Sequence, residues 1–114
     1  MDSVTYDEKL MTRVREALSG ASRVEEKRMF GGLAFMVNGK LCVSVGLSRI
    51  MCRVDPAMHG KLVRKRGCRT VTMKGREYKR YVRVEKMALE TREDVDYWVG
   101  LALHFNRRAR AAPK

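Results

Sequence analysis

Three short runs of alternating apolar and polar residues, joined by tight turns, constrain the fold of this chain most. The first run places Leu33, Phe35 and Val37 at every second position, and Asn38-Gly39 follows it directly. The next two runs alternate in the same way, with Leu41, Val43, Val45, Ile50, Cys52 and Val54. A period of two is typical of a half-buried strand, and Asn-Gly between such runs favours a hairpin. The stretch 33–54 therefore predicts three consecutive antiparallel strands.

The register of the first hairpin decides which side chains share a face. A two-residue turn would set Phe35 opposite Cys42. A three-residue loop, with Gly39 in the left-handed conformation of a bulge, instead sets Phe35 opposite Leu41. We favour the three-residue loop because it brings the apolar residues of both strands onto one face.

Helical patterns lie on both sides of these strands. Thr5 precedes an amphipathic stretch at 6–19, which it would cap. Asp55-Pro56, an N-cap residue followed by proline, opens a shorter helix. Thr91, with Asp94 three residues later, indicates a capping box at the start of a last helix. The chain thus predicts three helices.

The remaining segments complete a single domain over 1–114. A polar linker is expected at 21–28, with a short extended piece at Val24 as an alternative, and two further strands are centred on Val71 and Val82. The order is α-β-β-β-α-β-β-α without a parallel crossover, which predicts an α+β fold with helices packed against an antiparallel sheet. The residues 107–114 are expected to form a flexible basic tail.

A string at 28–40 carries a family resemblance: Arg-Met-Phe-Gly-Gly-Leu-Ala-Phe-Met-Val-Asn-Gly-Lys. It resembles the signature of the TfoX/Sxy amino-terminal-domain family, and 51–56, 73–76 and 81–84 fit the same family. The signature residues are Met29, Phe30, Gly31, Gly32, Asn38 and Gly39. We interpret the glycines as backbone devices and not as a phosphate cradle, because a strand and not a helix follows them.

The resemblance implies a role in gene regulation. Better-known members regulate bacterial competence for DNA uptake as coactivators, with a transcription-regulator partner, the cyclic-AMP receptor protein. Full-length regulators add a second, helical domain, so this chain resembles a stand-alone copy. Arg80 stands where a small residue is expected, and the chain is more basic than such members usually are.

The net charge of +12 is concentrated in the second half of the chain. Residues 1–55 hold 9 basic and 7 acidic side chains, whereas 56–114 hold 16 and 6. Such asymmetry creates a directional field and predicts a polyanionic partner. Salt-dependent, non-specific nucleic-acid contact is expected from Arg64, Lys65, Arg66, Arg69, Lys74, Arg76, Lys79, Arg80, Tyr81 and Arg83, the first three on the last turn of the second helix. A solvated outer face, or an acidic protein partner, is the alternative.

The second face of the first three strands is unusually apolar. It would carry Met36, Cys42 and Met51, between Arg49 and Arg53. Methionine-rich surfaces often accept partners, so a protein contact is expected there, with a homodimer as one form. Cover by a helix or by the tail is the alternative, and a small-molecule pocket between sheet and helices is a further hypothesis.

Catalytic and metal motifs are not recognised in the sequence. His59 and His104 lack ligand partners at suitable spacing, and the cysteines at 42, 52 and 68 match no metal motif. We therefore expect no enzyme activity, no metal and no cofactor, and buried thiols. Neither a signal peptide nor a membrane-spanning run is recognised, which predicts a cytoplasmic protein without membrane contact.

Overall fold

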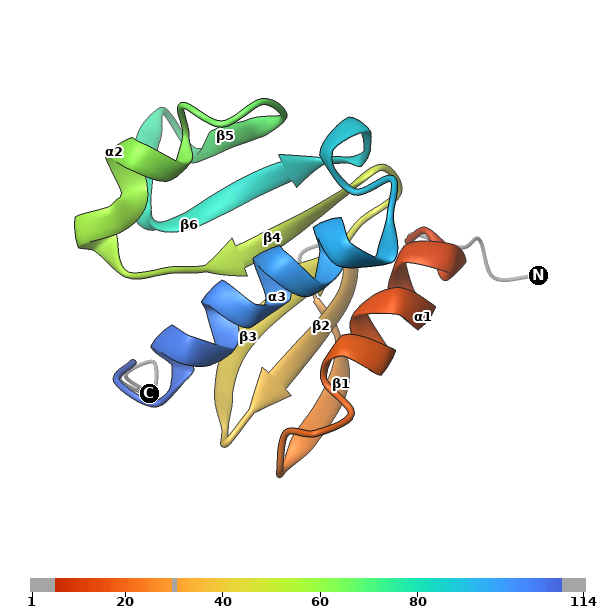
Figure 1. The fold of residues 1–114 in the computed structure, drawn as a ribbon. Coiled ribbons are helices and arrows are strands. Elements are labelled where there is room, and N and C mark those ends of the chain that lie inside the picture. The colour runs from red at the N-terminus through yellow and green to blue at the C-terminus, as the bar shows by residue number, and fades with distance from the viewer. Residues whose placement is uncertain (1–5, 30, 110–114) are drawn as a thin grey trace.

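The computed structural model describes residues 6–29 and 31–109, which form one antiparallel sheet and three α-helices (Figure 1). The strands are β1 Val24–Met29, β2 Gly32–Val37, β3 Lys40–Val45, β4 Arg49–Arg53, β5 Cys68–Met73 and β6 Arg76–Glu85, and the sheet order is β1-β2-β3-β4-β6-β5. The helices are α1 Glu8–Ala17, α2 His59–Leu62 and α3 Arg92–Asn106, with 3₁₀ turns at Pro56–Met58 and Lys86–Ala88. The predicted α+β class and element order are confirmed. The expected linker at 21–28 contains a further strand, β1.

Two rows of side chains run across the sheet and form the face that the helices cover. The first row is Glu26, Phe35, Val43, Cys52, Val82 and Thr70. The second row is Arg28, Leu33, Val45, Ile50, Val84 and Cys68. The four central residues of each row are buried and belong to one core cluster with residues of α1 and α3. Both helices lie in front of this face in Figure 1.

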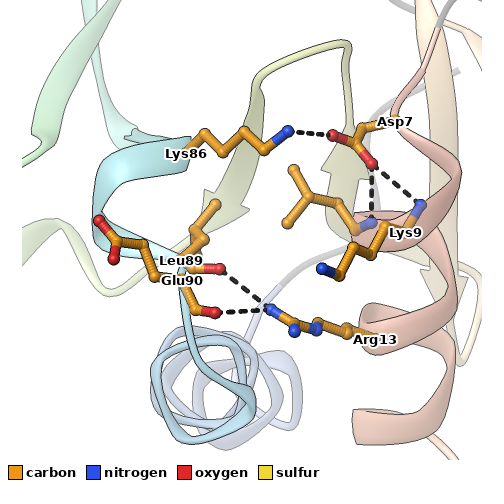
Figure 2. A network of polar contacts seen from close by, with 7 residues as sticks. Asp7, Lys9, Arg13, Lys86, Leu89 and Glu90 are labelled. Atoms are coloured by element: carbon orange, nitrogen blue, oxygen red, sulfur yellow. Dashed lines mark hydrogen bonds and ion pairs between the residues drawn. The ribbon is translucent and has the colours of Figure 1, made fainter.

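The first helix begins at Glu8, with Asp7 as its cap. The Asp7 carboxylate accepts hydrogen bonds from the backbone N–H groups of Lys9 at 2.9 Å and Leu10 at 3.1 Å. The same carboxylate forms an ion pair of 3.0 Å with Lys86 (Figure 2). One turn later, Arg13 donates to the carbonyl oxygen of Glu90 at 2.9 Å. These contacts attach α1 to the segment before α3. Thr5, the expected cap, lies outside the described residues.

The first hairpin closes through a two-residue turn, so the expected three-residue loop is wrong. Asn38 and Gly39 have φ angles of +53° and +76°, which suit a type I′ turn. The extra residue lies inside β3 instead, at Cys42, where the register shifts. The paired residues are Val37 with Lys40, Met36 with Leu41, Phe35 with Val43 and Leu33 with Val45. The bulge puts Val43 and Val45 on the same face as Phe35 and Leu33, but Leu41 lies opposite Met36 on the other face, so the expected pairing of Phe35 with Leu41 is wrong.

The signature glycines act on the backbone, as expected. Gly31 has a φ of +70° in the turn between β1 and β2. A Cβ atom on Gly32 would overlap the carbonyl oxygen of Val45 in β3, so Gly32 permits a close approach of two strands. Met29 is the last residue of β1 and is partly exposed, whereas Phe30 lies outside the described residues. The glycine pair thus shapes the β1–β2–β3 part of the sheet.

Candidate functional site

The sheet face opposite α1 and α3, here called the open face, carries its own row of side chains. Residues at directly opposite positions on neighbouring strands point to the same face. This row crosses all six strands as Lys27, Ala34, Ser44, Met51, Arg83 and Arg69. Its two ends are basic and its centre is small or apolar. Along this row, the open face therefore changes from basic on β1 to small or apolar on β2, β3 and β4, and to basic again on β6 and β5.

A hollow of about 440 Å³ lies on the β3–β4–β6–β5 part of the open face, here called the arginine groove. Its cations are Arg49, Arg69 and Arg83. Its apolar residues are Met51, Val71 and Met73, and Ser44, Gly46, Thr70 and Thr72 complete the lining. A volume of this size falls in the range of small-molecule sites. Its charged lining residues are all cations.

The three arginines reach the groove from three strands. Arg69 of β5 and Arg83 of β6 occupy directly opposite positions. The Nε atom of Arg83 donates to the Glu85 carboxylate at 3.0 Å, and Glu85 in turn lies opposite Arg49 of β4. Arg49 lies over Gly46, where an added Cβ atom would come within 2.6 Å of its Nη1 atom. With one carboxylate among three guanidinium groups, the groove holds an excess of about two positive charges.

The structure divides the predicted nucleic-acid residues between separate surfaces. Residues 64–66 follow α2, which already ends at Leu62, so their expected place on the last helical turn is wrong. Further along, the chain turns through Gly67, whose φ is +79°, directly before β5 begins at Cys68. Lys65 lies over the ring of Tyr97 in α3, 5.2 Å from its centroid. This basic cluster therefore lies on the helix side and not in the arginine groove.

Other predicted cations lie around the β5–β6 hairpin. Lys74 is in its turn, with a φ of +53°, and Arg76, Lys79 and Arg80 are exposed along the first half of β6. Of the predicted set, only Arg69 and Arg83 line the groove. Arg49 completes the groove but was not in that set. The available sequence signal was its position two residues before Met51, because residues two apart on a strand share a face.

The aromatic residue of the predicted set, Tyr81, is half-buried on β6 opposite Arg53 of β4. Tyr81 and Arg83 share the open face, because their β4 partners are Arg53 and Met51. The face that Lys79 occupies does not follow from this alternation. The β5–β6 register shifts between Thr70, which pairs with Val82, and Val71, which pairs with Tyr78. Base stacking on Tyr81 stays a prediction.

The predicted protein-contact residues also separate. Met36 is half-buried on the open face opposite Leu41, and Met51 lines the groove. Cys42 is wrong as a member of this face, because the bulge in β3 turns it into the helix-covered core, where it is 1% exposed. The described helices α1 and α3 both pack on the other face, so among described residues no helix covers Met36 and Met51.

The three cysteines and His59 are buried, whereas His104 is exposed. Cys42, Cys52 and Cys68 are free and buried, as expected. Burial raises the pKa of Cys42 to about 12 and that of Cys68 to about 11. His59 is buried, with its Nε2 atom 3.3 Å from the Thr70 hydroxyl, while His104 is exposed on α3. Within 6–29 and 31–109, no three His, Cys, Asp or Glu side chains group in a way that could hold a metal ion.

The described helices are all too short or too polar to cross a membrane. The fold and the groove together define an α+β domain with one helix-covered and one open sheet face. A family model, the TfoX N-terminal domain, matches residues 16–106. The chain belongs to the TfoX N-terminal domain family, which its glycine signature predicted. No curated protein and no solved structure matches the chain.

Proposed function

We propose that this chain is a non-catalytic, competence-related regulatory domain that acts by contact and binds nucleic-acid backbones through the arginine groove and its basic surroundings. Family membership supports the regulatory part of the proposal. The observation that carries the nucleic-acid part is the convergence of Arg49, Arg69 and Arg83 on the open face. Guanidinium groups suit phosphate oxygens, and release of counterions makes such binding strong at low salt and weakly selective.

Duplex DNA and RNA binding, followed by fluorescence anisotropy across a salt series, tests the nucleic-acid part. The double variant Arg69→Gln/Arg83→Gln should bind about tenfold more weakly and reduce the slope of log K against log salt by roughly two. The matched control is Lys9→Gln/Lys61→Gln, which removes two exposed charges from α1 and α2. Failure to bind at about 50 mM salt, or equal losses in both variants, would contradict the proposal.

A protein partner would use the neighbouring part of the open face. Met36 and Leu41 lie opposite each other and are half-buried, beside the groove that Met51 enters. A transcription regulator or a second copy of the chain are the proposed partners. Light scattering at micromolar concentration tests self-association, and a strictly monomeric protein would contradict the homodimer. Capture of a partner that survives nuclease treatment, combined with no nucleic-acid binding, would favour an acidic protein as the partner of the groove.

A further inference from the structure

We propose that the arginine groove is a site for a terminal phosphate group carried on a flat apolar body, as in a nucleoside monophosphate. This deepens the proposed function, with which it shares Arg69 and Arg83. Binding to a nucleic-acid backbone requires only a cationic surface. The groove adds a partly open hollow of small-molecule size, a matched charge and an apolar wall, and each of these points to a small phosphomonoester.

The first argument is charge. Arg69 and Arg83 face each other directly across β5 and β6, and like charges at such positions are destabilising. Glu85 contacts Arg83, and within the described residues neither Arg69 nor Arg49 forms an ion pair. The excess of about two positive charges equals the charge of a phosphomonoester, which is about −1.5 to −2 at pH 7. A bound dianion would remove the repulsion between the opposed arginines.

The second argument is the placement of Arg49. Gly46 has no side chain, so the Arg49 side chain lies against the backbone at the groove wall. A third guanidinium group is thereby held on β4, across the groove from Arg69 on β5. Planar guanidinium forks bind phosphate oxygens in pairs and fix the orientation of the group. Three such groups suit an end phosphate, whose three oxygens are all accessible.

The third argument is the apolar part of the groove. Val71 and Met73 follow Arg69 along β5 and line the same groove. Val71 is buried, whereas Met73 is 41% exposed at the end of the strand, and Met51 lies across from them. Flexible thioether side chains adapt to flat ligands. The phosphate would lie near Arg69 and Arg83, with the flat group along Val71 and Met73.

Calorimetric titration of the full chain with adenosine monophosphate, adenosine and inorganic phosphate tests this site. We expect one-to-one binding of the monophosphate, at least tenfold weaker binding of inorganic phosphate, and no binding of adenosine. Arg69→Gln/Arg83→Gln should lose at least tenfold, and Gly46→Ala, which displaces Arg49, severalfold. Lys9→Gln/Lys61→Gln should bind as the parent chain does. Thermal melts establish that each variant is folded. Absence of monophosphate binding, or equal binding by the arginine variant, overturns the inference.

A second experiment distinguishes this inference from the proposed function. It also distinguishes a free small ligand from the phosphorylated end of a nucleic-acid strand. It compares single-stranded oligonucleotides with a 5′-phosphate or a 5′-hydroxyl group. Tighter binding of the 5′-phosphate form, lost in Arg69→Gln/Arg83→Gln, supports a strand end as a source of the ligand. Equal binding of both forms without monophosphate binding overturns the inference and leaves the proposed function standing. Monophosphate binding without duplex binding at low salt supports the inference and contradicts the nucleic-acid part of the proposed function.

Discussion

Gly32 of β2 lies so close to the Val45 carbonyl oxygen of β3 that a methyl group at position 32 would overlap it. Gly32→Ala should therefore force β2 and β3 apart and lower the free energy of unfolding by about 2 kcal/mol or more. Urea unfolding followed by circular dichroism measures this. Gly31→Ala should cost about 1–2 kcal/mol through its positive φ alone, since its Cβ would meet open space. Gly20→Ala, also in open space but without a positive φ, is the control, and a Gly32→Ala variant as stable as this control would contradict the role assigned to Gly32.

The Asp7–Lys86 contact predicts a change of stability with pH (Figure 2). Burial raises the pKa of Asp7, but hydrogen bonds from Leu10, Lys86 and Lys9 lower it by more, so the net pKa lies below the ordinary 3.8. A lowered pKa in the folded state stabilises the protein above the unfolded pKa, and this contribution is lost as the pH falls through the folded pKa. Asp7→Asn keeps a cap but removes the charge.

We expect Asp7→Asn to be about 0.5–1 kcal/mol less stable than the parent chain at pH 6. The difference should shrink as the pH falls through the lowered pKa of Asp7 and vanish at the acid end, where the parent carboxylate is protonated. Urea unfolding of both chains at several pH values measures this. A difference that stays constant from pH 6 to the acid end would show that the charge of Asp7 is not its cause.

The buried cysteines should be inert in the native protein. Thiolate is the reactive form, and burial raises the pKa of Cys42 and Cys68 to about 12 and 11 and that of Cys52 well above its ordinary value. A chromogenic disulfide reagent at pH 8 should therefore react at least about a hundredfold more slowly than with a free thiol. In guanidinium, all 3 thiols should react at once. Rapid labelling of one thiol in the folded chain would show that it is accessible.

The capping box of α3 should contribute measurably to stability. The Thr91 hydroxyl accepts from the Asp94 backbone N–H at 3.1 Å, and the Asp94 carboxylate accepts from the Thr91 N–H at 3.1 Å. Thr91→Ala should lower the free energy of unfolding by about 1 kcal/mol. Thr12→Ala is the matched control, because Thr12 is exposed within α1 and its hydroxyl only donates to the Glu8 carbonyl oxygen. Equal effects in the two variants would argue against the cap.

Local features were the ones that the sequence predicted well. The capping box at Thr91, the Asp55-Pro56 helix start and the glycine pair each depend on a few neighbouring residues. All are present in the structure, although Asp55-Pro56 opens a 3₁₀ turn and α2 itself begins at His59. The strand β1 was not predicted because residues 25–28 are all charged, so neither face of this strand shows an apolar pattern. As an edge strand that pairs only with β2, it does not need an apolar face. The sequence pattern of such a strand resembles that of a polar linker.

Tertiary contacts decided the register and the groove. The longer loop would have placed Leu41 opposite Phe35, whereas the Asn-Gly turn with its bulge places Cys42 and Val43 in the core with α1 and α3 and leaves Leu41 on the other face. Arg49 is separated from Arg69 by 20 positions along the chain, and it reaches the same groove because β6 lies between β4 and β5. The sequence by itself determined the family, the fold class and the turn chemistry, because these follow from local conformation and period. Only the tertiary structure decided which charges meet, because strand order is set by the packing of the whole core.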